Sequence, residues 1–314
     1  MFLVPKNKLN NLRQRAEYLR RIREFFHARN ILEVETPLLC PTTVTDVYID
    51  SIRAQANEQL CFLQTSPEYA MKRLLVEGIG DCYQLGKAFR DHEHGRQHNV
   101  EFTLLEWYRL GFDHHALMNE VDELLQLMLN TPPAKRWSYQ TLFQEYLNID
   151  PHTATIEQLQ AIAIDNALLD TLGAACLDKD QWLMLLMSHT IEPKLGFDAP
   201  CFVYDYPATQ ASLANIRDHV GERFEVYVKG MELANGFHEL QHAGEQAERF
   251  ERDLAIRTQH QQFLPPIDTA FLAALERGLP ACSGVALGID RLMMLALNEP
   301  TIDAVISFRN FNPS

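Results

Sequence analysis

The segment YQLGKAFRDHEHGRQHNVEFTLLEWY, residues 83–108, decides the fold. Its two apolar ends, 83–90 and 101–108, flank a polar loop that is rich in histidine, glycine and asparagine. Apolar runs of this length on either side of a polar loop predict two strands that form a long-looped hairpin.

Charged and aromatic residues stand where the two predicted strands meet the loop. Arg90 ends the first strand, and Glu101 and Phe102 begin the second. An arginine at the end of a buried strand can hold a phosphate through two hydrogen bonds, and a neighbouring ring can stack on a base. An ion pair between Arg90 and Glu101 is an equally good interpretation of the pattern.

Further elements are expected on both sides of this hairpin. Residues 11–29 have the apolar spacing of a helix that Asn30 would end, and a strand follows over 31–35. We predict further strands at 61–65, 201–206, 224–233 and 284–288, and further helices at 67–76, from 113, at 244–262, at 268–277 and from 290. Ser66 is the expected cap of the helix at 67–76. Because the strands come in hairpins with helices between them, the predicted class is α+β, an antiparallel sheet flanked by helices.

Residues 131–200 differ in character from the rest of the chain. They begin at Pro132-Pro133, show helical periodicity around 156–168 and 179–190, and carry no cluster of reactive side chains. We interpret them as a helical insertion within a single catalytic domain that spans residues 1–314.

The charge of the chain disfavours nucleic acid as a partner. It has 28 lysines and arginines against 42 aspartates and glutamates, a net charge of −14, and such a surface repels nucleic acid unless its cations are clustered. One basic stretch exists, made of Lys6, Lys8, Arg13, Arg15, Arg20, Arg21 and Arg23. It is either a solvated helix face or a landing patch for an acidic partner.

The composition indicates a cytoplasmic protein. No apolar run is long enough to cross a membrane, and the start of the chain lacks the apolar core of a signal peptide. The six cysteines are scattered along the chain, which favours free thiols over a disulfide framework. They are Cys40, Cys61, Cys82, Cys176, Cys201 and Cys282. The chain has no P-loop, no dinucleotide-binding glycine motif and no zinc-protease or serine-hydrolase motif.

Two more polar segments lie in otherwise apolar surroundings. In ELANGFHE, residues 232–239, two carboxylates and an amide interrupt a buried strand, which suits a divalent cation with phosphate or a cationic substrate. In GVALGIDR, residues 284–291, small residues let a ligand approach the backbone, and Asp290 is expected to cap a helix. Arg291 in the first turn is disfavoured by the helix dipole, so we expect it to serve an anion or a stacked ring.

These segments together resemble the motifs of class II aminoacyl-tRNA synthetases of the lysyl branch. NILEVETP, residues 30–37, resembles motif 1, which builds the dimer interface of that family; residues 89–108 resemble motif 2, and residues 284–291 resemble motif 3. TSPEYAMKRLL (65–75) and ELANGFHEL (232–240) are similar to the paralogues that lack the anticodon-binding domain and join (R)-β-lysine to elongation factor P. The resemblance implies the class II catalytic fold, a homodimer, and elongation factor P rather than stably bound tRNA as the acceptor, since 314 residues leave no room for an anticodon-binding module.

The same resemblance implies a site for ATP and Mg²⁺. Arg90 would bind the α-phosphate and the substrate carboxylate, Phe102 and Arg291 would sandwich the adenine, and Glu232 would hold the metal together with Glu239. The remaining residues implied on the ATP side are Asp91, His92, Asn99, Leu233 and Gly288. The catalytic group would be Arg90, Glu232, Glu239 and Arg291.

The resemblance also implies a site for a lysine-type substrate. Tyr108 and Glu239 would receive its distal ammonium, and the segment Ser66-Pro67-Glu68 its other amine. Asn235 would bind the carboxylate, and Ala286 would form the pocket wall. Lysyl-tRNA synthetases usually have glycine in place of Ala286, and one methyl group contributes only about 1 kcal/mol to discrimination between lysine isomers.

The expected reaction is formation of a lysyl adenylate followed by transfer to the ε-amine of a lysine on elongation factor P. Two alternatives are an aminoacylating enzyme of the lysyl-tRNA synthetase type and a catalytically inactive regulatory paralogue. The second is favoured only by His92, which stands where motif 2 usually has glutamate. A third, an amide-forming ligase of free amino acids, is disfavoured by Tyr108 and Glu239.

Overall fold

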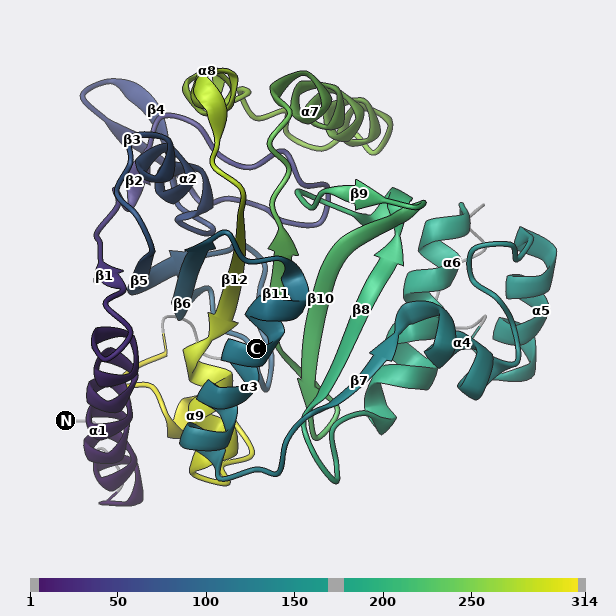
Figure 1. Ribbon diagram of the computed structural model, residues 1–314, viewed down its shortest axis with the longest axis horizontal. Helices are drawn as coiled ribbons and strands as arrows, with labels where there is room; N and C mark the ends of the chain where they lie inside the picture. Colours follow the sequence, from purple (N-terminus) through teal and green to yellow (C-terminus); the bar gives the residue numbers. More distant parts are fainter. Residues whose placement is uncertain (1–5, 169–177, 310–314) are drawn as a thin grey trace. The chain divides into compact units, whose positions relative to one another are not determined.

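The computed structural model describes residues 6–168 and 178–309 (Figure 1). They form two compact units, one from the residues up to Phe112 together with those from Leu240 onward, and one from Asp113–Glu239. Each unit contains a mostly antiparallel sheet with helices, which confirms the predicted α+β class. No helix in the described part of the chain is long and apolar enough to cross a membrane.

The predicted hairpin forms the centre of the first unit's sheet. Strand β5 (Cys82–Phe89) pairs antiparallel with β6 (Glu101–Leu110), within two residues of the predicted ends. On the other side of β6 lies the antiparallel β12 (Cys282–Gly288), and the short β1 (Leu32–Glu33) runs parallel to β5. A separate sheet has the order β2 (Leu39–Cys40), β4 (Gln59–Leu63), β3 (Arg53–Ala56).

Five α-helices of the first unit accompany these strands: α1 (Lys6–His27), α2 (Glu68–Val76), α7 (Ala243–Gln259), α8 (Thr269–Gly278) and α9 (Ile289–Ala296). Phe26 anchors α1 on the hairpin, because its ring stacks on Tyr83 at a centroid distance of 4.4 Å and meets Trp107 edge-on at 5.3 Å. Asn30 has a φ of 56°, the left-handed conformation predicted for the end of this helix. The strand predicted at 31–35 is shorter than expected, since only β1 forms there.

Asp290 joins three segments that are far apart in sequence. Its Oδ2 accepts the backbone N–H of Thr103 in β6 at 2.8 Å, and its Oδ1 lies 2.7 Å from the guanidinium of Arg15 in α1. Arg15 also donates to the Thr103 hydroxyl at 2.9 Å. The prediction that Asp290 caps a helix is wrong, since Gly288 is the N-cap of α9 and the carboxylate is bound to β6 instead.

The cap predicted for α2 is also displaced. Pro67, not Ser66, occupies the N-cap position of α2, and the helix has no side-chain hydrogen bond from its N-cap residue. The Ser66 hydroxyl nevertheless accepts the backbone N–H of Glu68 at 3.1 Å, so it satisfies one N–H of the first turn. This contact fixes Ser66 beside the start of α2.

The second unit also has its sheet at the centre, in the order β7 (Lys135–Ser138), β8 (Cys201–Pro207), β10 (Val220–Val228), β11 (Met231–His238). Strand β7 is parallel to β8, the other pairs are antiparallel, and β9 (Ile216–Arg217) pairs with β10. The single strand predicted over 224–233 is wrong. Lys229 and Gly230, with φ values of 52° and 71°, form a turn that divides the segment into two strands.

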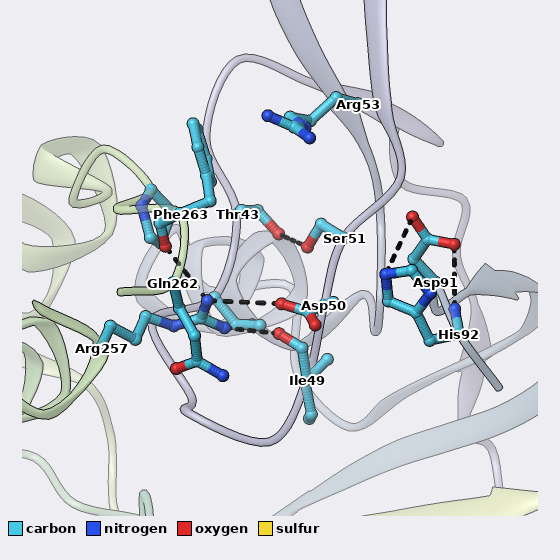
Figure 2. A pocket seen from close by; sticks show the side chains of 12 residues that line it. Thr43, Ile49, Asp50, Ser51, Arg53, Asp91, His92, Arg257, Gln262 and Phe263 are labelled. Atoms are coloured by element: carbon cyan, nitrogen blue, oxygen red, sulfur yellow. Dashed lines mark hydrogen bonds and ion pairs between the residues drawn. The ribbon is translucent and has the colours of Figure 1, made fainter. Parts of the chain in front are cut away.

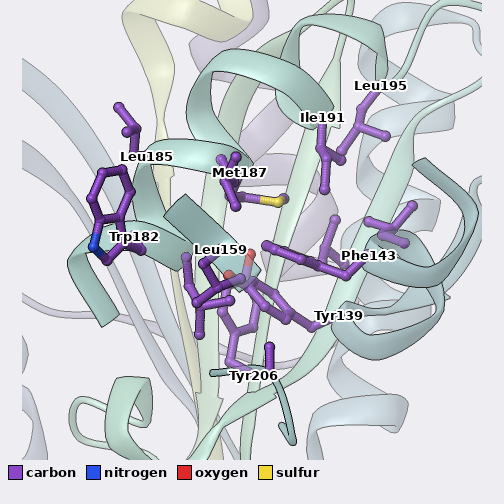
Figure 3. Close-up of a cluster of buried hydrophobic side chains, with 14 of the residues drawn as sticks. Tyr139, Phe143, Leu159, Trp182, Leu185, Met187, Ile191, Leu195 and Tyr206 are labelled. Carbon is purple, nitrogen blue, oxygen red and sulfur yellow. The ribbon is translucent and has the colours of Figure 1, made fainter. Parts of the chain in front are cut away.

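The segment 131–200 contains the predicted helices and also a strand that the sequence did not reveal. Helices α4 (Tyr139–Leu147), α5 (Ile156–Asp165) and α6 (Lys179–Leu186) follow β7, while α3 (His114–Leu129) precedes it with Asp113 as its cap. Figure 3 shows the buried cluster that these helices share, which includes Tyr139, Phe143, Leu159, Trp182 and Leu185. Because Tyr206 and Tyr227 of the sheet belong to the same cluster, the segment packs as part of the unit's own core.

Arg257 of α7 holds the loop formed by residues 43–51 (Figure 2). Its side chain is only 3% exposed. A guanidinium has five N–H donors, and here their acceptors are the carbonyls of Thr45, Asp46, Ile49 and Phe263 and the carboxylate of Asp50. Arg257 therefore crosslinks the loop to the end of α7 and has no donor left for a ligand.

We expect Arg257→Met to lower the free energy of unfolding by about 3 kcal/mol or more, because buried carbonyls lose their donor. Urea denaturation followed by circular dichroism would measure the change. Arg252→Met, an exposed position on the same helix, should change it by no more than about 0.5 kcal/mol. Equal effects of the two substitutions would contradict the crosslinking role of Arg257.

Candidate active site

One face of the first unit's sheet gathers most of the site residues predicted there. Side chains alternate along a strand, so Phe102, Glu106 and Tyr108 of β6 share a face. On β12 the residues of this face are small: Gly284 is paired with Tyr108, Ala286 with Glu106 and Gly288 with Leu104. On β5 the small residues Ala88 and Gly86 are paired with Phe102 and Leu104, whereas the buried Gln84 is paired with Glu106. Small residues on both flanking strands allow a ligand to approach the backbone there.

Glu106 lies at the centre of this face and is 2% exposed. Its carboxylate accepts hydrogen bonds from the Ser66 hydroxyl at 2.6 Å and from the Tyr108 hydroxyl at 2.8 Å. Burial raises its pKa to about 7, and the nearby Glu68 carboxylate acts in the same direction, while the two hydrogen bonds and Lys72 oppose the shift. A buried carboxylate with these partners is suited to an ammonium group.

The sequence interpretation gave Glu106 no role, although Ser66, Glu68 and Tyr108 around it were all predicted site residues. The signal was present, since a glutamate interrupts the apolar run of a central strand. A charged residue is almost never fully buried unless it is paired. Glu106 thus contacts both Ser66 and Tyr108, which the resemblance had assigned to different amines of the substrate.

Arg90 extends the same face beyond the end of β5. Its backbone N–H bonds the Val100 carbonyl at 3.0 Å, and its guanidinium lies 5.3 Å from the centroid of the Phe102 ring. The alternative ion pair between Arg90 and Glu101 is wrong, because Glu101 pairs with Lys87 at 3.1 Å and Arg90 with Glu93 at 3.4 Å. The half-buried Arg90 and the ring of Phe102 are therefore adjacent, as phosphate and base binding requires.

Arg291 lies in the first turn of α9, as predicted, and its guanidinium is 2.5 Å from the His98 ring nitrogen Nε2. Burial lowers the pKa of His98, and the charge of Arg291 lowers it further, so the neutral ring can accept this hydrogen bond. Asn99 is 2% exposed and donates to the Glu101 carbonyl at 2.7 Å. At Gly288 an added Cβ would make an ordinary contact of 3.7 Å with the Arg291 side chain, so the described protein atoms themselves do not require glycine there.

Asp91 and His92, predicted on the ATP side, line a pocket of about 200 Å³ (Figure 2). The rest of its wall comes from Thr43, Val44, Ile49, Asp50, Ser51, Arg53, Arg257, Gln262, Phe263 and Pro265. The backbone N–H of Asp91 binds the Asp50 carbonyl at 2.8 Å, and His92 has a left-handed φ of 61°. Neither Arg90 nor Phe102 belongs to this lining. Asp91 and His92 therefore line a different pocket from the face that holds Arg90 and Phe102.

In the second unit, β11 carries Glu232 and Asn235 on one face because of a bulge, and Glu239 directly follows the strand. Ala234 pairs with Val226, but Glu232 pairs with the next residue, Tyr227, so Leu233 is an extra residue in the strand. Without the bulge, Glu232 and Asn235 would face opposite sides, since they are three positions apart. The bulge shifts the alternation by one residue and brings Glu232 to the same side of the strand as Asn235.

A buried polar cluster supports Asn235. Its amide nitrogen lies 3.4 Å from a Glu225 oxygen, and that carboxylate also accepts the hydroxyls of Tyr206 at 2.7 Å and Tyr227 at 2.5 Å and pairs with Arg223. The buried amide oxygen of Asn235 has no hydrogen-bond partner among the described residues. It is therefore available to a donor group of a ligand.

Comparison with known proteins identifies the family. The family model described as tRNA synthetases class II (D, K and N) matches residues 1–312. This chain belongs to that family. It is 51% identical to the elongation factor P–(R)-β-lysine ligase of Vibrio cholerae, over 97% of both chains, and 50% identical to that of Pseudoalteromonas translucida over the same shares. The corresponding ligase of Yersinia pestis is 49% identical over 97% of this chain and 96% of its own.

Within residues 6–168 and 178–309, no three histidine, cysteine, aspartate or glutamate side chains lie close enough together to hold a metal ion. Glu232 belongs to β11, Glu239 directly follows this strand, and Glu239 is 2% exposed. Mg²⁺ in nucleotide sites is commonly bound by one or two carboxylates together with substrate phosphates. The two residues present thus fit Mg²⁺ that arrives with a nucleotide.

Three of the seven cations in the basic stretch form ion pairs within the described residues. Arg20 pairs with Glu17 and Glu24, Arg23 pairs with Glu33 at 3.0 Å, and Arg15 is bound to Asp290 inside the first unit. Three of the cations counted in the sequence are therefore matched by nearby carboxylates. The patch offers less charge to an acidic partner than the sequence suggested.

We expect the unfolding free energy of the protein to depend on pH through the titration of Glu106. Because the pKa of this carboxyl is raised from 4.5 to about 7 by folding, its burial destabilises the fold as the pH rises through this range. Glu106→Gln cannot titrate, so its unfolding free energy relative to the parent should increase by roughly 1–3 kcal/mol between pH 5 and pH 8.

Chemical denaturation at the two pH values, without ligands, measures this difference. Glu248→Gln, which removes an exposed carboxylate from α7, is the matched control and should give the same difference at both. A Glu106→Gln effect that does not depend on pH would contradict the assignment of a titrating buried acid.

Proposed function

We propose that this chain is an ATP-dependent, AMP-forming ligase that activates (R)-β-lysine and transfers it to the ε-amine of a lysine on elongation factor P. Membership of the class II family and about 50% identity to ligases of that name over nearly the whole chain support this proposal. The structural observation that carries it is the buried Glu106, a site for an ammonium group on the same face as Arg90 and Phe102.

The first step would join substrate and nucleotide. A carboxylate oxygen of the lysine attacks the α-phosphorus of ATP, the bond to the bridging oxygen breaks, and pyrophosphate leaves. Arg90 orients both reacting groups and neutralises the charge that develops between them, an electrostatic contribution that needs no proton transfer. Phe102 and Arg291 hold the adenine. Mg²⁺, held by Glu232 and Glu239, supplies further neutralisation of the phosphates when it is bound.

In the second step the ε-amine of the acceptor lysine attacks the acyl carbon of the adenylate. An amide bond forms, the acyl–oxygen bond breaks, AMP leaves with the electron pair, and the amine releases a proton. No side chain of this chain becomes acylated in this scheme, since the adenylate is already an activated acyl donor.

Each unit, taken by itself, carries polar residues that suit a charged group of a lysine-type substrate. On the first unit, Glu106 with Ser66, Glu68 and Tyr108 would hold one ammonium group. On the second unit, the amide N–H group of Asn235 that is not directed at Glu225 would bind a carboxylate, and Glu239 would take an ammonium group. Ala286 stands directly opposite Glu106 in the β6–β12 ladder, which supports its proposed role as a wall that favours the β-amino isomer.

Exposed apolar residues support a homodimer. The side chains of Leu32, Leu38, Leu39 and Leu60, on and beside the short strands that follow α1, are 41–52% exposed. Large apolar side chains exposed on the surface can mark a protein interface when they lie together. Leu32 lies within residues 30–37, the segment that resembles motif 1, which builds the dimer interface of the family.

We also propose a cytoplasmic location. Cys40, Cys61, Cys82, Cys201 and Cys282 are all free thiols, as a reducing compartment favours, whereas Cys176 lies outside the described residues.

The proposal predicts ATP–pyrophosphate exchange that depends on a lysine isomer. We expect exchange with (R)-β-lysine, weaker or comparable exchange with α-lysine, and none with aspartate. Labelled β-lysine should then transfer to elongation factor P and not to tRNA. Arg90→Ala should lower exchange about 100-fold or more, whereas Arg13→Ala, an exposed position on α1, should leave it unchanged.

Absence of exchange with every lysine isomer would refute the proposed activity. Transfer to tRNA instead of elongation factor P would establish the aminoacylating alternative. Detection of an acylated side chain by mass spectrometry would exclude direct transfer from the adenylate.

A further inference from the structure

A buried lysine lies beside the proposed ammonium site. Lys72 of α2 is 1% exposed, and its Nζ is 2.6 Å from the Glu68 carboxylate. The same nitrogen lies 5.8 Å from the centroid of the Phe271 ring in α8. Burying a charge is costly unless it is paired, so this lysine must serve a purpose that an apolar residue of similar length would not.

Lys72 belongs to a continuous chain of contacts that reaches Glu106. Glu68 pairs with Lys72, the Glu68 backbone N–H binds the Ser66 hydroxyl at 3.1 Å, and that hydroxyl donates to Glu106 at 2.6 Å. Tyr108 closes the chain on the other oxygen of Glu106 at 2.8 Å. Two carboxylates and one ammonium group therefore share a buried space on the first unit.

We propose that Lys72 is a positioning residue that sets the charge of this site. Its ammonium is a built-in counter-ion for Glu68, so the site offers one uncompensated carboxylate, Glu106, and takes one ammonium group of the substrate. This inference rests on the proposed function only in the identity of the ligand, a lysine-type amino acid. The charge relation itself is a property of the empty protein.

The other titratable groups near Glu106 are neutral, so the charge of the site is set by Glu68, Glu106 and Lys72. Burial raises the pKa of Cys82 on β5 to about 12, and burial raises that of Tyr69 on α2 well above its usual value, so both are neutral. The carboxylates of Asp46, Asp253 and Asp268 act on Tyr69. Without Lys72, Glu68 and Glu106 would repel each other, and such pairs retain a proton to a higher pH.

The charge model predicts pH shifts of opposite sign for two single substitutions. The kcat/KM for (R)-β-lysine in pyrophosphate exchange should rise with pH as Glu106 ionises in the free enzyme. Lys72→Met should move this rise upward by about one pH unit or more, and Glu68→Gln should move it downward, because the neighbouring charge is removed in each case. The double variant keeps the net charge of the site and should return close to the parent profile, and Lys72→Arg should resemble the parent.

A merely structural role for Lys72 would lower kcat/KM equally at every pH, and the two substitutions would not compensate each other; either result would overturn the proposal. If Lys72→Met fails to fold, Glu68→Gln still tests it, since an unchanged profile would contradict the charge relation.

A second measurement separates this inference from the proposed function. The pH dependence of the unfolding free energy, measured without ligand, should shift in the same opposite directions for Lys72→Met and Glu68→Gln. If the parent shows no lysine-dependent exchange, the proposed function fails, but the opposite shifts in stability still support the charge relation. Equal or absent shifts in stability overturn it whether or not the enzyme is active.

Discussion

The hydrogen bond from the Thr103 backbone to the Asp290 carboxylate fixes the geometry on which the nucleotide half of the site depends. Phe102 precedes Thr103 and Arg291 follows Asp290, so this one contact sets the ring and the guanidinium relative to each other. The carboxylate is 3% exposed and would be costly without a counter-ion. Arg15 supplies that charge from α1, which explains how the helix next to motif 1 is required for a site built by motifs 2 and 3.

The positions of the other site residues follow from the alternation of side chains along strands. On β5, β6 and β12 a regular ladder puts residues of even number on one face, where β6 contributes Phe102, Glu106 and Tyr108 and β12 contributes only glycine and alanine beside them. On β11 the functional residues are unevenly spaced, and the bulge at Leu233 restores a common face. An inserted or deleted residue in either strand would turn half of these side chains away from the ligand.

The helices and strands with regular apolar spacing could be predicted from the sequence. Those that are defined only by pairing with another part of the chain could not. The hairpin around Arg90 and the long helices were predicted correctly, because their apolar spacing is regular over many residues. The turn at Lys229-Gly230 was missed, since apolar runs on both sides of it read as one strand, and β7 was missed because only its pairing with β8 makes it a strand. Glu106 and Lys72 were passed over for the same reason: in sequence each interrupts an amphipathic or apolar pattern, and only tertiary contacts show what neutralises it.

The distribution of cations also changes what the net charge of −14 means for the acceptor. Arg15, Lys72 and Arg257 are used inside the first unit, and Arg20 and Arg23 are paired on its surface. Among the described residues, however, seven acidic side chains are buried against three lysines and arginines, so the exposed surface is less acidic than a count along the sequence implies. Salt screens the remaining exposed charges beyond about 10 Å, so long-range attraction contributes little to acceptor choice. Recognition of elongation factor P would then depend mainly on shape and short-range contacts around the lysine that is modified.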